Sequence, residues 1–204
     1  LIPHQEMAVI LSNRGFIKRV PAHIYKAQHR GGKGIIGMVT REEDAVRLLA
    51  IADTHDYLLL CTTRGRVFSL KCYEVPPDTS RVAKGLAVVN LFSIPPEEKV
   101  SDMVVITNFD PNLYLLMGTR SGEIKKTSLD HFTAVRSSGL IGMDVEKDDE
   151  LTSARIATEQ DDVVMVTQKG QSIRFSVESI RTSQRTSGGV KGIKLFDDDK
   201  VVGM

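Results

Sequence analysis

The run Gln28-His29-Arg30-Gly31-Gly32-Lys33-Gly34 holds the residues of this sequence that are best suited to binding an anion. Its three glycines lack a Cβ, so the main chain can turn sharply and bring its N–H groups close to a phosphate. Arg30 and Lys33 supply positive charge, and Gln28 and His29 supply further hydrogen-bond donors. The run is therefore predicted to contact phosphate groups. The same glycines also suit a tight turn that locks the local structure, and one loop can serve both roles.

Three weaker copies of this run follow it at a regular interval. They are Ser80-Arg81-Val82-Ala83-Lys84-Gly85, Arg136-Ser137-Ser138-Gly139 and Thr186-Ser187-Gly188-Gly189-Val190-Lys191-Gly192. An apolar residue comes directly after the last glycine of every copy, and the copies recur about every fifty residues. A period of this length fits a repeat of about four strands.

Each repeat begins with a pattern that is typical of a β-hairpin. A short apolar run leads into Ser/Thr-x-x-Gly, and a second strand-like run returns from the glycine. A glycine at this place suits the positive φ of a tight hairpin turn. The four turns are Ser12–Gly15, Thr62–Gly65, Thr119–Gly122 and Thr167–Gly170. Each repeat is expected to hold two more strands, one after the closing glycine and one before the next hairpin, as at 46–52, 103–106 and 153–157.

These elements predict an all-β, propeller-like fold of four-stranded blades. A single blade cannot bury both of its faces, so adjacent blades must cover one another. The chain of 204 residues is interpreted as one domain or domain fragment, with blades at about 1–45, 46–96, 97–147 and 148–198. Residues 199–204 are interpreted as the start of a fifth blade, because Lys200–Met204 repeat the pattern of Lys99–Met103.

Charge is segregated along the chain although the net charge is only +1. The stretches 14–34, 64–85, 120–139 and 169–194 hold 21 of the 27 basic residues and 5 of the 26 acidic residues. This recurring segregation predicts a basic outer rim, separated from an acidic surface, that suits the phosphate backbone of duplex DNA. Aromatic residues make up only 5% of the chain, which disfavours a stacking platform for single strands. The predicted DNA contacts are Arg14, Lys18, Arg19, Lys26, Gln28, His29, Arg30, Gly31, Gly32, Lys33, Gly34, Arg64, Arg66, Lys71, Arg81, Lys84, Arg120, Lys125, Lys126, Lys169, Arg174, Arg185 and Lys191.

The run at 28–34 and its copies resemble the signature box of the C-terminal domain of the bacterial DNA gyrase A subunit. The Ser/Thr-x-x-Gly hairpins extend the resemblance over essentially the whole chain. His29 stands where family members usually carry arginine, and the third copy has no lysine. The resemblance implies a β-pinwheel, a propeller-like fold whose blades exchange strands with their neighbours and which commonly has six blades.

The resemblance also implies a function. In this family duplex DNA wraps around the basic rim, and the blade with the signature box fixes the wrap to support ATP-dependent negative supercoiling by the complete enzyme. The implied partners are duplex DNA, the remainder of the gyrase A subunit, and the gyrase B subunit, in an A2B2 complex. The catalytic tyrosine and the sites for ATP and Mg²⁺ lie elsewhere in the parent enzyme. This chain is therefore expected to be a non-catalytic domain of a type II DNA topoisomerase, without a cofactor of its own.

The residues themselves give no sign of a catalytic or metal site. Lys33 is followed by Gly34, so the run is not a P-loop, and the five histidines are scattered without the spacing of metal ligands. Cys61 and Cys72 are interpreted as reduced thiols of a cytosolic protein. The sequence shows no secretion signal and no apolar run of about 20 residues, which predicts a cytoplasmic protein that does not enter a membrane. The resemblance implies that this protein is bacterial and acts with the chromosome.

Two other functions fit the same repeats. The related C-terminal domain of topoisomerase IV shares the fold but usually has a less regular box. A propeller can also serve as a scaffold for protein interactions, in which case it would bind partners through its faces or loops and would have no affinity for duplex DNA.

Overall fold

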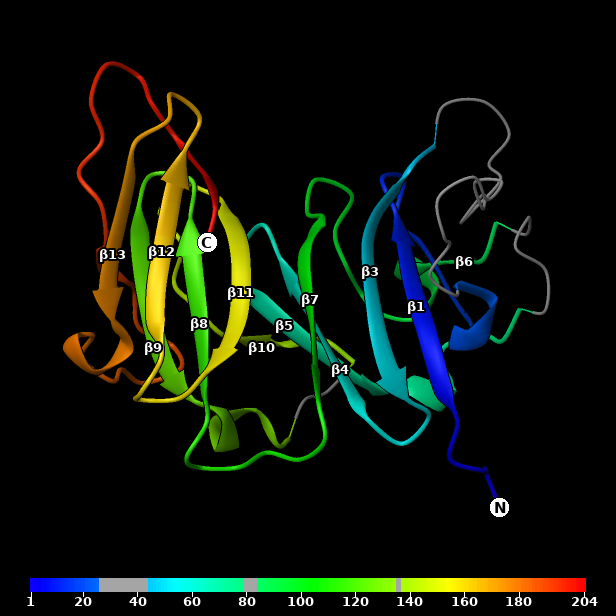
Figure 1. Cartoon of the computed structure of the whole chain (residues 1–204). Helices are drawn as coiled ribbons and strands as arrows, with labels where there is room; N and C mark the ends of the chain where they lie inside the picture. Colours follow the sequence, from blue (N-terminus) through cyan, green and yellow to red (C-terminus); the bar gives the residue numbers. More distant parts are fainter. Residues whose placement is uncertain (26–43, 79–83, 135–136) are drawn as a thin grey trace, which may run out of the picture. The chain divides into compact units, whose positions relative to one another are not determined.

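The computed structural model describes residues 1–25, 44–78, 84–134 and 137–204, which form β-strands joined by short 3-10 turns (Figure 1). The predicted hairpins are all present. They are β1 (Glu6–Ser12) with β2 (Phe16–Pro21), β4 (Tyr57–Thr62) with β5 (Arg66–Lys71), β8 (Tyr114–Thr119) with β9 (Glu123–Ser128), and β12 (Asp162–Thr167) with β13 (Ser172–Ser176).

The Ser/Thr-x-x-Gly sequence builds each hairpin turn in the same way. The turn glycines, Gly15, Gly65, Gly122 and Gly170, all have φ between 80° and 93°, a conformation that other residues adopt only with strain. The hydroxyl that opens the turn accepts a hydrogen bond from the N–H four residues later, as Ser12 does from Phe16 at 3.1 Å. The equivalent bond is present in the other three hairpins. This bond explains why the turn begins with serine or threonine.

Seven further strands complete four antiparallel sheets. The strands that flank the first strand of each hairpin are β3 (Val46–Asp53), β7 (Val100–Ile106), β11 (Leu151–Ala157) and β15 (Val201–Gly203). The short strands that flank the second strand are β6 (Leu86–Ala87), β10 (Leu140–Ile141) and β14 (Val190–Lys191). The strand orders are β3-β1-β2-β6, β10-β5-β4-β7, β11-β8-β9-β14 and β13-β12-β15. The predicted all-β class is thus confirmed.

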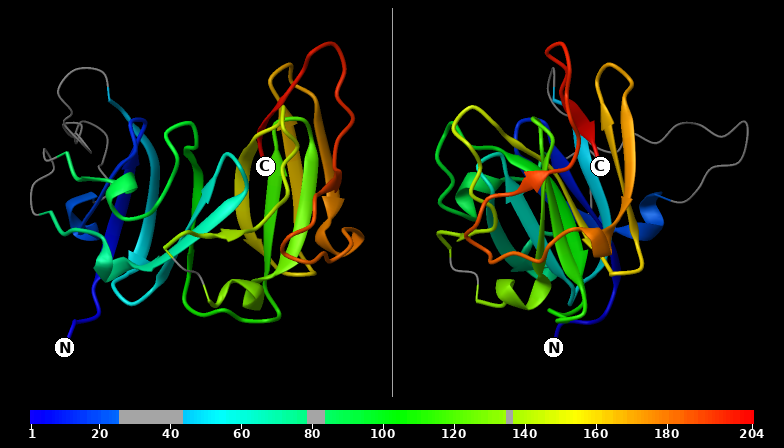
Figure 2. Two further views of the ribbon diagram at one scale, coloured as in Figure 1. Left: turned by 180° about the vertical axis from the view of Figure 1, so that it is seen from behind. Right: turned by 90° about the vertical axis from the view of Figure 1, so that its left-hand side faces the viewer.

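The short strands are exchanged between repeats. Each lies in one repeat but pairs with the hairpin of the repeat before it, as Leu86 pairs with Ile17 and Val190 with Ile124. The segment that crosses to the preceding hairpin begins after a 3-10 turn in each case. These turns are η2 (Cys72–Glu74), η4 (Leu129–Phe132) and η5 (Val177–Ser179). Two further 3-10 turns are η1 (Ala22–Tyr25), which follows β2, and η3 (Val88–Asn90), which follows β6. Figure 2 shows the last crossing, where the orange-to-red segment after η5 runs to the green strand β9.

The sheets do not follow the predicted blade limits. The strand β3 falls in the predicted second blade but pairs with β1 of the first, over the register Glu6↔Asp53 to Ser12↔Val46. In the same way β11 pairs with β8, and β15 pairs with β12 rather than opening a fifth sheet. The apolar pattern of such a strand fits either neighbouring hairpin, so only the backbone ladder decides its sheet.

Contacts divide the chain into two compact units. The first comprises Leu1–Leu59, Ser69–Pro95 and Val105–Asn108, and the second comprises Leu60–Phe68, Pro96–Val104 and Phe109–Met204. In the first unit Ala8, Ile10 and Val20 form a buried cluster with Ile24 packed against it.

The core of the second unit joins two consecutive repeats. Its cluster includes Leu116 and Ile124 of the third hairpin, Met165 and Val177 of the fourth repeat, and Ile193 from the crossing segment. Burying apolar side chains of both repeats in one cluster makes each repeat depend on the next for its stability. In the part of the chain that the structure describes, no helix is long and apolar enough to span a membrane.

Candidate nucleic-acid interface

The predicted signature box lies outside the described residues. So do two other predicted contacts, and nothing structural is concluded about any of them. The predicted contacts concerned are Lys26, Gln28, His29, Arg30, Gly31, Gly32, Lys33, Gly34 and Arg81.

Three of the predicted contacts are buried lysines. The exposed fractions of Lys18, Lys125 and Lys126 are 0%, 1% and 2%. An ammonium group in these positions cannot reach a phosphate of a wrapped duplex, so their prediction as DNA contacts is corrected. The physical reason is visible in the repeat: Lys18 and Lys125 stand three residues after the turn glycine, where the second hairpin buries Phe68. That position is buried in the first three hairpins, whichever residue occupies it.

Lys125 connects two segments of the second unit. Its Nζ donates to the carbonyl of Gly142 at 2.7 Å and to the carbonyl of Arg185. Burial and the nearby Arg185 guanidinium lower the pKa of Lys125 to about 8, with Asp144 acting in the opposite direction. Burial likewise lowers the pKa of Lys18, opposed by Asp78. Lysines held in this way stabilise the fold through their donors rather than through a charge offered to a ligand.

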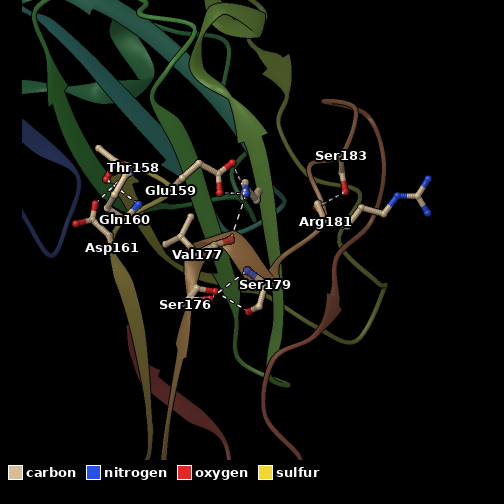
Figure 3. Close-up of polar contacts among 10 residues, drawn as sticks. Thr158, Glu159, Gln160, Asp161, Ser176, Val177, Ser179, Arg181 and Ser183 are labelled. Carbon is tan, nitrogen blue, oxygen red and sulfur yellow. Dashed lines mark hydrogen bonds and ion pairs between the residues drawn. The ribbon is translucent and has the colours of Figure 1, made fainter.

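Lys126 is bonded to the repeat that follows it. Its Nζ lies 2.9 Å from both carboxylate oxygens of Glu159 and 3.2 Å from the carbonyl oxygen of Val177. The accepting groups of Glu159 and Val177 lie close together in Figure 3. Hydrogen bonds from Lys126 and Tyr114 lower the pKa of Glu159, and the Tyr114 ring centre is 4.5 Å from Nζ. All donors of this ammonium group are directed into the protein.

Several arginines bind backbone carbonyls of loops. Arg64 donates to the carbonyls of Asp149 at 2.7 Å and Val145 at 2.9 Å. Arg19 donates to the carbonyls of Val75 at 2.7 Å and Tyr73 at 3.3 Å. Such charge-assisted bonds satisfy carbonyls that the irregular crossing segments leave without a strand partner.

Arg66 takes part in a polar cluster beside the second hairpin turn. Its guanidinium lies 2.8 Å and 2.9 Å from the two carboxylate oxygens of Glu98 and also donates to the carbonyl of Ser138. The hydroxyl of Thr62 donates to the same carboxylate. Although burial acts in the opposite direction, the hydrogen bonds from Arg66 and Thr62 hold the pKa of Glu98 below its ordinary value.

The remaining paired cations follow the same rule. Each donates to a carbonyl or a carboxylate of the same unit. The pairs are Lys71 with the His55 carbonyl, Arg120 with the Asp148 carbonyl and the Glu150 carboxylate, Lys169 with the Asp197 carbonyl, Arg174 with the Asp162 carboxylate, and Arg185 with the Ile141 carbonyl.

Acidic residues lie directly against the basic hairpin turns. Asp44 accepts a hydrogen bond from the N–H of Arg14, and Asp199 accepts one from the N–H of Lys169. Asp149 does the same for Ser121 in the third hairpin. At these turns the described residues therefore do not show the predicted separation of acidic from basic groups. Acidic and basic stretches that are separate in the sequence come together in the fold, because the strand after each acidic loop pairs with a hairpin.

A smaller set of cations is exposed. Of the predicted contacts Arg14, Lys84, Lys169, Arg174 and Lys191 are exposed, and Lys84 lies 4.0 Å from the ring centre of Phe16. Two exposed cations that the prediction missed, Arg181 and Lys194, lie on the last crossing segment together with Lys191. The Arg181 side chain points away from the other labelled residues in Figure 3. The absence of acidic residues between Ser179 and Leu195 was the signal in the sequence that could have identified them.

The described residues contain no group of side chains that could hold a metal ion. Cys61 and Cys72 are free and buried, and burial raises the pKa of both thiols, that of Cys72 to about 11. Both thiols are thus protonated at neutral pH and poorly nucleophilic.

A family model described as the DNA gyrase C-terminal domain, beta-propeller, matches residues 6–53, 56–107, 113–158 and 161–204. The chain belongs to the family of DNA gyrase C-terminal domains. Each matched segment begins at a hairpin and ends at the strand that pairs with the first strand of that hairpin. This is the grouping of the sheets rather than that of the predicted blade limits. The predicted resemblance is confirmed.

Relatives support the same assignment. The chain is 50% identical over 204 residues to the DNA gyrase A subunit of Dehalogenimonas lykanthroporepellens, covering all of this chain and 25% of the relative. It is 39% identical over 205 residues to the DNA gyrase A subunit of Staphylococcus epidermidis, covering 23% of that protein. The chain thus spans about a quarter of the length of these relatives.

Two solved structures show the same fold. A gyrase A C-terminal domain matches with a TM-score of 0.81 and 27% identity, covering 97% of this chain and 64% of the other. The C-terminal domain of a DNA topoisomerase IV matches with a TM-score of 0.77 and 25% identity, covering 99% and 61%. The fold of this gyrase-type domain is therefore a β-pinwheel, as the resemblance implied.

Proposed function

We propose that this chain binds and wraps duplex DNA as the C-terminal domain of a gyrase A subunit. The observation that carries the proposal is the family match over four consecutive repeats, which leaves no repeat unassigned. The exposed cations on the crossing segments supply groups that can neutralise phosphates without reading bases, as wrapping requires.

The proposed contacts are fewer than the basic residues of the sequence. Within the described part of the chain they are the exposed cations of the turns and crossing segments, and the box residues 28–34 with Lys26 and Arg81 remain predicted contacts. The described members are Arg14, Lys84, Lys169, Arg181, Lys191 and Lys194.

The energetics suit a distributed set of contacts. Bending a duplex of 20–30 base pairs by 40–90° costs on the order of 1–6 kcal/mol. Several phosphate contacts offset this cost, and eight of them would give a log–log salt slope of about −7. Wrapping by this domain is therefore expected to weaken steeply as salt rises.

The proposed role depends on a larger enzyme. We infer that the chain works with the remainder of the gyrase A protein and with the gyrase B protein, since the relatives it matches are gyrase A proteins of about four times its length. In that complex ATP and Mg²⁺ belong to other domains, and this chain contributes no catalytic residue or cofactor. The bacterial relatives support a place on the chromosome in the cytoplasm.

Relaxation of a closed circular DNA with the domain bound tests the proposal. Wrapping is expected to shift the linking number of the circle, and the double variant Arg30→Ala/Lys33→Ala is expected to reduce the shift. The matched control is Lys99→Ala/Lys147→Ala, which removes two exposed lysines outside the four basic stretches and should leave the shift unchanged. A chain without duplex affinity even at low salt would contradict the proposal and favour the protein-interaction scaffold.

The C-terminal domain of topoisomerase IV is the second candidate, because a solved domain of that enzyme has nearly the same TM-score. The assembled enzyme distinguishes the two. A gyrase introduces negative supercoils into a relaxed circle with ATP, whereas a topoisomerase IV does not.

A further inference from the structure

The first residue after a hairpin turn lies beside the start of an exchanged strand at two junctions between repeats. At the first junction these residues are Phe16, directly after the turn glycine, and Lys84, two residues before β6. At the second junction the equivalent residues are Arg66 and Ser138. The equivalence follows from the strand pairing, because β6 and β10 pair with their hairpins in the same register. Both junctions thus bring the same two positions together.

At the first junction the two side chains form a cation–π contact. The ammonium nitrogen of Lys84 lies 4.0 Å from the centre of the Phe16 ring. The face of an aromatic ring carries negative partial charge and therefore attracts a cation. Lys84 is exposed and Phe16 is half-buried, so the ring is anchored in the fold while the ammonium group remains accessible from solvent.

The main chain holds both residues of this contact in place. Gly85, which follows Lys84, has a φ of 85°, and a Cβ at this residue would lie 2.5 Å from the carbonyl oxygen of Ile17. Glycine permits this close approach of the crossing segment to the hairpin. The N–H of Phe16 donates to the hydroxyl of Ser12 at 3.1 Å. The lysine and the ring therefore meet because the backbones of two repeats are fixed beside them.

The second junction brings the same positions together, but its cation is already paired. Arg66 donates to the carbonyl of Ser138 at 2.9 Å, and its guanidinium lies 2.8 Å and 2.9 Å from the carboxylate oxygens of Glu98. A phosphate would have to displace this carboxylate. Among the described residues Lys84 makes no ion pair of this kind. Of the two junctions, the first thus offers the accessible positive charge.

We propose that Phe16 is a positioning residue that holds the Lys84 ammonium group ready for a phosphate of duplex DNA. This role rests on the proposed function, because it deepens one of the proposed phosphate contacts. A free lysine side chain loses rotamer entropy when a contact fixes it. The ring restrains the side chain before DNA arrives, so less of that entropy is lost on binding. An ammonium group has three N–H donors, and contact with one ring face leaves donors for a phosphate oxygen.

A double-mutant cycle on duplex affinity tests this role. Lys84→Met removes the phosphate contact, so it should weaken binding about fivefold and make the log–log salt slope shallower by about 1. Phe16→Leu keeps the charge but removes the ring, so it should weaken binding about threefold and leave the slope unchanged. In the Lys84→Met background Phe16→Leu should have no further effect, because the ring then has no cation to hold. Gel shifts over a salt series measure all four affinities.

Two further variants separate this role from a purely structural one. Phe16→Tyr retains an aromatic ring and should retain the wild-type affinity. Tyr57→Leu is the matched control, because Lys71 lies 3.6 Å from the centre of the Tyr57 ring but donates to the carbonyl of His55 and is not a proposed DNA contact. Removal of that ring should leave duplex binding unchanged.

Two results would overturn the role of Phe16. One is an equal loss of affinity from Phe16→Leu with and without Lys84, and the other is an unchanged affinity of a folded Phe16→Leu variant. Both would leave the proposed function intact, since the wild-type chain would still bind duplex DNA. A wild-type chain without duplex affinity at low salt would reject the proposed function and this role with it. If Phe16→Leu does not fold, Phe16→Met removes the ring at a similar volume and takes its place in the cycle.

Discussion

The third and fourth hairpins use the same positions in different ways. On β9 the third and fourth residues after the turn glycine are Lys125 and Lys126, both buried, and on β13 they are Ile173 and Arg174, both exposed. The third hairpin carries the crossing segment of the next repeat, and the fourth has no such cover among the described residues. The comparison teaches that the neighbouring repeat, rather than the residue type, decides whether a basic side chain in this fold is exposed.

The largest difference between the hairpins is expected at their turn glycines. Gly122→Ala adds a Cβ at positive φ that would lie 2.8 Å from a backbone oxygen, so it should destabilise the fold by about 3–4 kcal/mol. Gly170→Ala meets only open space and should cost about 1 kcal/mol of backbone strain. Urea unfolding of both variants measures the difference, and equal losses would show that the fourth turn is also covered.

The stability of the third hairpin is expected to depend on pH through Lys125. Its pKa is about 8 in the folded chain, against an ordinary value of 10.5 when the chain is unfolded. Between these values the unfolded chain binds more protons than the folded one, so stability rises with pH across this window, by about 2–3 kcal/mol. Lys125→Met should lose this rise, which urea unfolding from pH 7 to 10.5 would reveal. The variant retains Lys18, whose lowered pKa acts in the same direction, so a smaller rise should remain.

Replacing Lys126 should change the stability of the chain less than the two preceding changes. Lys126→Ala removes the buried ammonium group that donates to both the Val177 carbonyl and the Glu159 carboxylate, and it should destabilise the chain by about 2 kcal/mol. The matched change Arg174→Ala removes an exposed pair and should cost less than about 0.5 kcal/mol in the 204-residue chain. Thermal unfolding distinguishes them. Similar losses would contradict the difference in burial on which the comparison depends.

The smallest expected change concerns DNA. Arg181→Ala/Lys191→Ala removes two exposed cations of the last crossing segment, and it should weaken duplex binding about tenfold and make the log–log salt slope shallower by about 2. The folding free energy should change by less than about 0.5 kcal/mol. Gel shifts over a salt series measure the effect. Lys125→Met serves as the control that removes a buried cation, and a loss of affinity in it would place that lysine at the interface after all.

The hairpins and their turns could be predicted from the sequence because local chemistry determines them. Ser12 and Gly15 specify their turn through one hydroxyl and one positive φ, and the same pattern recurs in every repeat. The sheet to which β3 belongs could not be predicted, since its apolar residues suit a ladder with β1 or with β4 equally well. The family resemblance indicated that blades exchange strands, and the strand registers of the structure showed which strands pair.

The candidate site was predicted less well than the fold. Counting charge along the chain treats every basic residue as exposed, but Lys126 and Arg64 direct their donors to carbonyls far away in the sequence. Such pairings depend on segments that are brought together only by the crossing strands. Arg181, by contrast, was missed because it lies away from the glycine motif on which the prediction concentrated.

The exchange of β14 onto β9 has a consequence for proteolysis. A cut in the loop between η5 and β14 would separate the chain into two covalent pieces, yet the piece after the cut would remain hydrogen-bonded to a strand of the piece before it. The pieces would migrate together in native gels and come apart only in denaturant. Nicking at these loops would thus be silent in any assay that reads size without unfolding the sample.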